Sequence, residues 1–395
     1  MSFLVSLLFI IEFALFPVKE IIYSTFSVNF SIITIILYLC EFSLVAYLVF
    51  YQINNNTYDL YKVDILFILL MLFIISVMVA HVDYRGYSHD GNLVSTITEY
   101  KIVTYRFIIF YLMGRLCLNI SDFFVSNYFK CFIYMIFSFL FLLYLGPGFN
   151  FTESGINYLD ISDRMIILMF VVLIFNKNKW FLTLISIVLI FILNSRSNFV
   201  FYTTSLLLSL FLFSQDKRLP FFYLCLVVVL YVLFVSFNAE IISYLRYSGV
   251  DERFVSLLSF TELSNDPSQL GRIAYFKHGF QDILNNPILG SFGGQLSSSG
   301  PGGERWGAFM HSAISYWRQF GLIVMLLVAY YLLILPTTPK IRLYYNFNIY
   351  IASFVFYTVF SAIFTKAFLW AGFSFYCGFL VSLLVNRNKF ESLNS

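Results

Sequence analysis

Long apolar runs separated by short polar gaps dominate the hydrophobic pattern of this chain. A backbone that crosses a bilayer must satisfy its N–H and C=O groups internally, and apolar runs of about 17–25 residues therefore predict membrane-spanning helices. The pattern predicts an all-α polytopic membrane protein with about 12 transmembrane helices, some of them short. The predicted spans are 3–17, 28–51, 63–82, 103–120, 128–146, 163–176, 179–194, 197–214, 220–238, 312–335, 347–364 and 367–386.

One polar connection, 239–311, is far longer than the others and divides the chain into three parts. We expect spans one to nine in 1–238, a large loop in 239–311, and three further spans with a tail in 312–395. Within the loop, "PSQLGRIAYFKHGFQDILNNP" places Leu270, Ile273, Ala274, Ile283 and Leu284 at helical spacing. This spacing predicts an amphipathic helix that lies on the membrane surface or on the bundle and ends at Pro287.

The composition supports a membrane protein and excludes several other classes. The chain is 60% hydrophobic and 11% charged, with a mean hydropathy of +0.83, which no soluble domain of this size is expected to show. A net charge of +3 is too small to indicate nucleic-acid binding. The five cysteines have unrelated spacings and lie in or beside predicted spans, which is typical of small buried apolar residues. Segment 2–17 lacks a basic start and an A-x-A site, so we interpret it as the first span and not as a signal peptide.

The distribution of basic residues sets the predicted orientation. With both termini in the cytoplasm, the inner segments carry more Lys and Arg than the short outer loops. Nine of the 13 arginines fall on the outer face in this arrangement. The guanidinium group is permanently charged and binds phosphate through a bidentate fork, so an outer face rich in arginine indicates phosphate recognition.

Arg196 and His311 are the most informative residues on that face. Arg196 lies in the short polar gap "NSRS" between two apolar runs and has no acidic neighbour in sequence, which makes it a candidate ligand-binding residue. His311 opens the tenth span after a flexible Gly/Ser-rich stretch. A neutral imidazole there could take a proton from a sugar hydroxyl. The structural alternatives are an interfacial anchor for the arginine and a hydrogen-bonded interfacial side chain for the histidine.

Other chemistry finds little support in the sequence. The segment "HVDYRGYSHDG" has two His and two Asp close together, but its spacing matches no familiar metal-ligand pattern. The chain has no P-loop, G-x-S-x-G, H-E-x-x-H or C-x-x-C motif. We therefore expect neither a metal nor a cofactor.

Three segments now follow one another in an informative order. They are "NSRSN", which opens a span, "GRIAYFKHGFQDILNNPILGSFGG", which contains Arg272, and "HSAISYWRQFGLIVML", which begins with His311. In this order, and with the large outer loop, the chain resembles the O-antigen polymerase and O-antigen ligase superfamily (the Wzy and WaaL types). The resemblance covers about residues 195–335 and favours the polymerases.

The resemblance implies a metal-independent glycosyltransferase on the periplasmic face of the bacterial inner membrane. Its donor would be a glycan on undecaprenyl diphosphate, and a polymerase would transfer it to another lipid-linked repeat unit. Arg196 and Arg272 would bind the donor diphosphate, and His311 would be the general base on the acceptor hydroxyl. The other outer-face arginines Arg164, Arg253 and Arg305 are additional substrate-binding candidates. A chain-length regulator protein is an expected partner, besides the membrane lipid.

Two alternatives stay open at this point. An O-antigen ligase would use the same chemistry with lipid A–core as acceptor, and no residue here identifies the acceptor. A lipid-linked oligosaccharide flippase would carry charge in a cavity among its spans and would need no long outer loop. The charges of this chain gather in loops on one face, which favours an enzyme.

Overall fold

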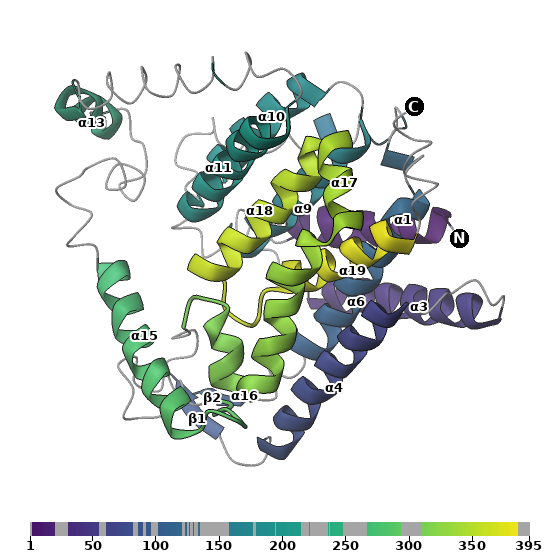
Figure 1. Cartoon of the computed structure of the whole chain (residues 1–395), viewed down its shortest axis with the longest axis vertical. Helices are drawn as coiled ribbons and strands as arrows, with labels where there is room; N and C mark the ends of the chain where they lie inside the picture. Colours follow the sequence, from purple (N-terminus) through teal and green to yellow (C-terminus); the bar gives the residue numbers. More distant parts are fainter. Residues whose placement is uncertain are drawn as a thin grey trace.

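The computed structural model is almost entirely helical over the part of the chain that it describes (Figure 1). The residues described are 2–19, 31–54, 61–81, 86–89, 92–95, 102–120, 123–124, 126, 129, 133–134, 158–176, 179–193, 195–214, 221, 236, 238–247, 267–293 and 310–385. A two-stranded antiparallel hairpin, β1 (Gly86–His89) and β2 (Asn92–Ser95), lies in a segment for which only a polar loop was predicted. The all-α membrane fold class is confirmed.

The first half of the chain forms helices close to the predicted spans. They are α1 (Ser2–Ile10) with the π-helical turn η1 (Ile11–Leu15), α3 (Ser31–Asn54), α4 (Lys62–His81), η3 (Ile102–Arg106) with α6 (Phe107–Leu116) and η4 (Cys117–Ile120), α9 (Tyr158–Phe175), α10 (Lys179–Ile192) and α11 (Arg196–Phe213). Most of the predicted span 128–146 lies outside the described residues.

The second half adds the loop helices and the last spans. They are α13 (Asn238–Tyr247), α15 (Pro267–Asn285), α16 (Ile314–Ala329) with η7 (Tyr330–Ile334) and η8 (Leu335–Thr337), α17 (Pro339–Phe347), α18 (Ile349–Phe364) and α19 (Ala371–Val385). Most of the predicted span 220–238 lies outside the described residues. In the part described, Lys62–Ala80 and Ile314–Thr337 are long and apolar enough to cross a membrane, and five shorter apolar helices accompany them. The number of spans therefore stays a prediction.

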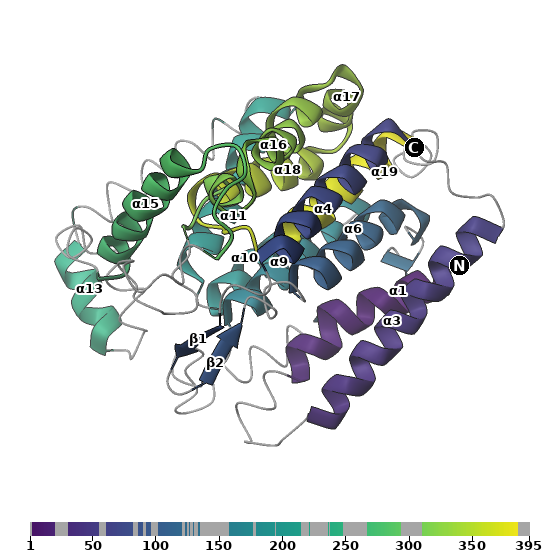
Figure 2. The ribbon, with the colours of Figure 1, turned by 90° about the horizontal axis from the view of Figure 1, so that it is seen from below.

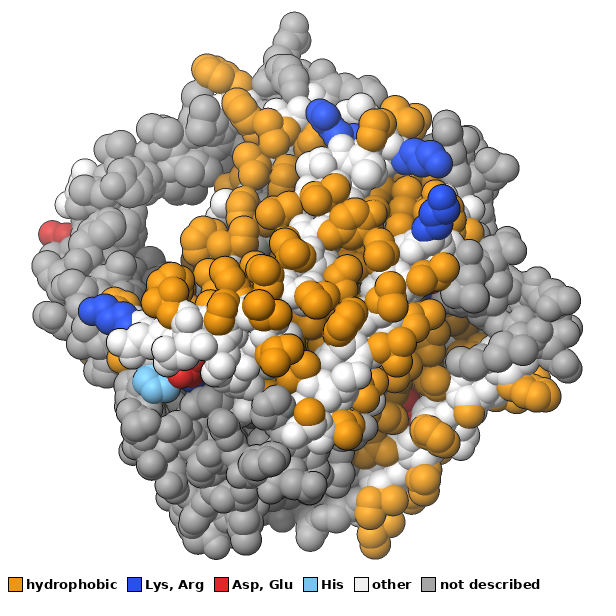
Figure 3. Space-filling model, turned by 60° about the horizontal axis from the view of Figure 1, so that its bottom comes forward, with side chains coloured by type: hydrophobic (Ala, Val, Ile, Leu, Met, Phe, Trp, Pro, Cys, Tyr) orange, Lys and Arg blue, Asp and Glu red, His pale blue; other side chains and the backbone are white. Residues whose placement is uncertain are grey.

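The helices form a bundle with α9, α18, α19 and α6 at its centre (Figures 1 and 2). Helices α1 and α3 flank one side, α15 lies on the other side, and α13 stands apart in both views. Large apolar side chains point outward from several helices, including Ile32 on α3, Leu184 on α10 and Leu326 on α16. Figure 3 shows this as a broad hydrophobic surface with charged side chains toward its margins. Such a surface is expected of a bundle that faces lipid.

Two glycines allow α6 and α19 to pack backbone against backbone. A Cβ atom at Gly114 would lie 2.1 Å from the carbonyl oxygen of Phe375, and one at Gly378 would lie 2.1 Å from that of Tyr111. Small residues at such crossings are typical of membrane helices, because close backbone approach replaces the hydrophobic effect that lipid does not supply. The two glycines therefore fix the central helix pair.

Polar contacts join helix ends that the predicted topology places on the same side of the membrane. At the predicted inner face, Asp64 on α4 accepts hydrogen bonds from Tyr111 at 2.5 Å and from Arg115 at 3.1 Å on α6. At the predicted outer face, Asp163 near the start of α9 contacts the start of α11 and the connection 365–370 between α18 and α19. These contacts agree with antiparallel neighbours, while the direction across the membrane stays a prediction.

The predicted span 312–335 is not one continuous helix. Gly321 interrupts α16 with φ 84° and ψ −177°, a conformation that residues with a Cβ atom rarely adopt. The prediction of a single helix was wrong here because an apolar pattern does not reveal a break that one glycine permits.

Candidate functional site

Helix α15 is fixed to α16 through a buried arginine, Arg318, that the sequence did not single out. Arg318 is 1% exposed. Its guanidinium donates two hydrogen bonds to the carboxylate of Asp282 on α15, at 2.9 and 2.7 Å. The same group lies 3.2 Å from His278 Nδ1. A buried guanidinium needs such a partner because desolvation of an unpaired charge is costly. The pair therefore sets the position of α15 beside the bundle.

The helix predicted in the long loop is confirmed, and its faces are now visible. It ends at Asn285, two residues before Pro287. Ile283 is buried against the bundle, whereas Ile273 and Leu284 are more than half exposed. The contact face toward α16 is therefore built around Gly279, Asp282 and Ile283, and the predicted apolar residues do not form one buried face.

The turn after α15 packs into the break of α16, and this joins the second and third sequence motifs. Trp317 Nε1 donates to the Pro287 carbonyl at 2.7 Å, and the Leu322 amide donates to the Ile288 carbonyl at 3.2 Å. A Cβ atom at Gly321 would lie 1.9 Å from the Ile288 oxygen, and one at Gly290 would lie 2.5 Å from the Gly321 nitrogen. Both glycines have positive φ. The chain accordingly has glycine on both sides of this contact.

His311 lies just before α16 and rests on the connection between α18 and α19. The backbone there is tied down by the Ala313 amide, which donates to the Ala362 carbonyl at 2.5 Å. The half-buried His311 ring interacts with the Thr365 backbone carbonyl, which favours the protonated ring. If one ring N–H is directed at that carbonyl, the other nitrogen is the basic atom of the neutral imidazole.

The surroundings of His311 favour its neutral form. Burial lowers its pKa most, the positive charges of Arg272 and then of Lys366 lower it further, and the Thr365 carbonyl partly offsets them, which gives a pKa of about 4. The exposed Arg272 of α15 therefore acts electrostatically on the histidine that sequence reasoning paired with it. A neutral imidazole at pH 7 has the protonation state that a general base requires.

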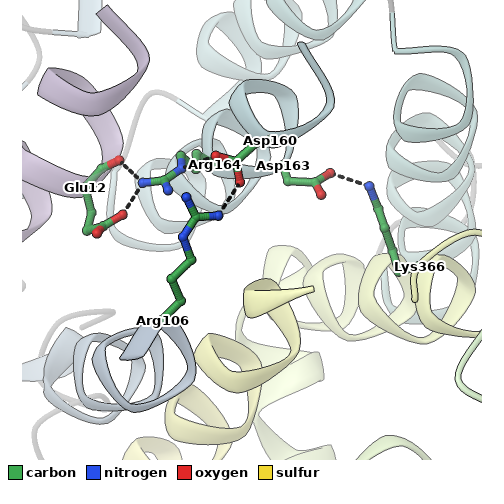
Figure 4. Close-up of polar contacts among 6 residues, drawn as sticks. All are labelled: Glu12, Arg106, Asp160, Asp163, Arg164 and Lys366. Carbon is green, nitrogen blue, oxygen red and sulfur yellow. Dashed lines mark hydrogen bonds and ion pairs between the residues drawn. The ribbon is translucent and has the colours of Figure 1, made fainter. Parts of the chain in front are cut away.

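A buried network at the start of α9 connects the surroundings of His311 to the start of α11. The Lys366 ammonium lies 2.5 Å from Asp163 Oδ1 (Figure 4), and Asn198 Nδ2 donates to the same oxygen at 2.6 Å. Tyr357 donates to Asn198 Oδ1 at 3.2 Å. Arg196 is the first residue of α11, two positions before Asn198; its side chain lies outside what the structure describes.

Arg164 takes part in an internal ion-pair network. Its guanidinium donates to the carbonyl and the carboxylate of Glu12 and to Asp160 Oδ2 at 3.2 Å, and Arg106 also reaches Asp160 at 3.4 Å (Figure 4). The Arg164 side chain is 5% exposed. This arrangement gives Arg164 protein carboxylates as partners, so we leave it out of the diphosphate site proposed below.

Two further predicted candidates lie outside the described residues, and three residues near the site were not predicted. Arg253 and Arg305 lie outside the described residues. Lys366 and Asp163 were missed, and the only signal for them was their position at predicted span ends. Arg318 was missed inside the predicted span 312–335. Within the described part, no group of three or more His, Cys, Asp or Glu side chains is arranged to hold a metal ion.

Comparison with known families finds a match in the middle of the chain. The O-antigen ligase family model matches residues 181–321, which begins in α10 and ends at the Gly321 break. No curated protein and no solved structure matches the chain. The matched stretch contains Arg196, Arg272 and His311. Residues 181–321 therefore form an O-antigen ligase family domain, consistent with the superfamily of O-antigen polymerases and ligases.

Proposed function

We propose that this protein is an O-antigen polymerase, which transfers a growing glycan from undecaprenyl diphosphate to a second lipid-linked repeat unit at the periplasmic face. The observation that carries the proposal is the meeting of three features. The Thr365 carbonyl interacts with the His311 ring, Arg272 acts on that ring electrostatically, and both His311 and Arg272 lie in the O-antigen ligase family domain.

In the proposed reaction, an acceptor hydroxyl attacks the anomeric carbon of the donor sugar. The bond between that carbon and the diphosphate oxygen breaks, and the lipid diphosphate leaves with its bonding electrons. His311 takes the hydroxyl proton through the ring nitrogen that does not face Thr365. Arg272 and Arg196 stabilise the negative charge that develops on the diphosphate, which is the role of preorganised cations in such reactions.

The charges around His311 link binding of the donor diphosphate to the basicity of the His311 imidazole. Arg272 and Lys366 both lower the pKa of His311 in the free protein. A bound diphosphate would neutralise part of that positive charge and would thereby raise the pKa of His311. The imidazole would thus become a stronger base when the donor is in place.

The experiment that tests the activity is deletion in the native host with lipopolysaccharide separated on a gel. A polymerase deletion leaves core carrying a single repeat unit, and Arg272→Ala or His311→Ala should give the same pattern while the protein stays in the membrane. Normal ladders from either variant would remove that residue from the site. Accumulation of repeat units on the cytoplasmic side would instead indicate a flippase and overturn the proposal.

The ligase is the second candidate, because the matching family model is described as O-antigen ligase and fits both activities of the superfamily. A ligase would use the same residues and would transfer the glycan to lipid A–core. Its deletion leaves bare core together with retained lipid-linked polymer, so the same gel separates the two activities. Dependence of chain length on a regulator protein stays a prediction of the polymerase assignment.

A further inference from the structure

Lys366 occupies a position that neither the sequence motifs nor the family domain points to. It follows Thr365, whose carbonyl interacts with the His311 ring, and it lies beyond the matched stretch 181–321. Its backbone is fixed by the amide, which donates to the Ser361 carbonyl at 2.8 Å. Its ammonium contacts Asp163 and lies 5.9 Å from the centre of the Trp370 ring.

The cations of the network at the start of α9 differ in where they lie. Arg164 contacts Glu12 and Asp160, and Arg106 contacts Asp160, on the side of α1. Lys366 contacts Asp163 on the side of α18 (Figure 4). Of these three cations, Lys366 is the one whose charge acts on His311. An ammonium has three N–H donors, so binding to Asp163 leaves capacity for an anionic ligand.

We propose that Lys366 is a further cation of the polyprenyl-diphosphate site and that Asp163 is its ion-pair partner when no diphosphate is bound. The inference rests on the proposed function, because it assumes that a diphosphate reaches this face. Asp163 also holds Asn198, two residues after Arg196. One carboxylate therefore positions Lys366 and the start of α11 relative to each other.

A purely structural ion pair is the competing explanation, and charge changes at the two partners separate it from the proposal. If Lys366 serves only to neutralise Asp163, then loss of either partner harms the protein in a similar way. If Lys366 binds diphosphate, loss of the ammonium weakens binding, whereas Asp163→Asn removes a competing negative charge and keeps an oxygen for Asn198. The two substitutions then have different effects on ligand affinity.

The test measures binding of farnesyl diphosphate and farnesyl monophosphate to the purified full-length protein in detergent. Lys366→Met should weaken diphosphate binding roughly 10- to 100-fold, the size expected for one charged hydrogen-bonded contact, and Lys366→Arg should restore part of it. Asp163→Asn should bind the diphosphate as tightly as the wild type or more tightly. Lys340→Met changes an exposed lysine of α17 and should bind like the wild type.

The outcomes distinguish this inference from the proposed function. Wild-type affinity in Lys366→Met, together with weakened binding in Arg272→Gln, would overturn the role of Lys366 and leave the proposed function standing. Equal losses in Lys366→Met and Asp163→Asn, with matching falls in melting temperature, would make the pair structural and would also overturn it. Absence of saturable diphosphate binding to the wild type would reject the proposed function itself.

Discussion

His311 combines the basic atom of the candidate site with surroundings that keep it neutral. Because burial and the charges of Arg272 and Lys366 lower its pKa to about 4, the free imidazole is unprotonated above that pH and charged below it. Activity that needs the neutral ring should therefore be insensitive to His311 protonation between about pH 5 and 8 and should fall as the pH drops through the lowered pKa.

We predict that this titration can be followed by NMR of ¹³C-histidine-labelled protein, with the His311 signal assigned by its loss in His311→Gln. The midpoint should lie near 4 in the wild type. It should move upward in Arg272→Gln, because the removed charge disfavoured the imidazolium. Lys340→Met should leave it unchanged. A wild-type midpoint near the ordinary histidine value of about 6.5 would contradict the assigned surroundings.

Gly321 occupies a crowded position in the break of α16. Gly321→Ala adds a Cβ atom 1.9 Å from the Ile288 oxygen, at a residue with φ +84°, and should lower the free energy of unfolding by more than about 2 kcal/mol. Gly271→Ala is the matched control, because its new Cβ meets nothing nearer than Tyr275 at 3.8 Å. Thermal unfolding in detergent measures both, and similar melting temperatures for the two variants would show that the α16 break is not needed.

The sequence allowed some residues of the site to be predicted better than others. Arg196 and His311 stood out because a charge or an imidazole beside an apolar run is unusual, whereas Arg272 was identified through the order of the three segments. Lys366 and Asp163 did not stand out, because their importance depends on a contact at 2.5 Å between residues 203 positions apart. Arg318 was hidden for the same reason, since its partner Asp282 lies on another helix.

At the scale of elements, the pair of Arg318 and Asp282 determines how α15 sits on α16. Asp282→Ala leaves the buried guanidinium without its carboxylate, which costs about 3–5 kcal/mol for fully buried pairs. The cost here should fall below that range, because the Asp282 side chain is 21% exposed. The double variant Asp282→Ala/Arg318→Met removes the orphaned charge and should recover part of the loss.

Limited trypsin digestion gives the readout for this pair, because Lys277 is an exposed cleavage site on α15. We predict faster cleavage there in Asp282→Ala than in the wild type, and an intermediate rate in the double variant. Lys277→Gln identifies the relevant fragment by its absence. Equal cleavage rates in all three proteins would mean that other contacts hold α15 in place.

Periodicity in the sequence predicted the long helices well and the irregular elements poorly. Apolar runs gave α3, α4 and α18 with ends within a few residues, since hydrocarbon thickness dictates their length. The hairpin of β1 and β2 and the short helix α17 were missed, because both lie in short polar connections with no repeating apolar pattern. Helix α15 was predicted, but its contact face depends on one buried charge pair and not on apolar spacing.

At the scale of the molecule, close backbone packing and paired charges hold the bundle together. Helices α6 and α19 touch through Gly114 and Gly378, while ion pairs close the predicted inner and outer ends. In lipid the hydrophobic effect does not drive helix association, so close packing and polar contacts must stabilise the bundle. This explains why buried charges occur at helix ends of a chain that is 11% charged.

The predicted orientation of the bundle places α15 and α17 on opposite sides of the membrane. Helices α15 and α17 lie near opposite ends of the apolar stretch Ile314–Thr337, whose 24 residues would span about 36 Å as an uninterrupted helix. With both termini in the cytoplasm, the exposed Lys277 of α15 faces the periplasm and the exposed Arg342 of α17 faces the cytoplasm.

We predict that a membrane-impermeant maleimide labels Lys277→Cys in intact spheroplasts, while Arg342→Cys is labelled only after the membrane is opened. The wild type, with its five native cysteines, measures background labelling in both conditions. The reverse pattern would place α15, Arg272 and His311 in the cytoplasm, where a periplasmic glycan transfer could not use them. Labelling of both variants in closed spheroplasts would mean that Ile314–Thr337 does not cross the membrane.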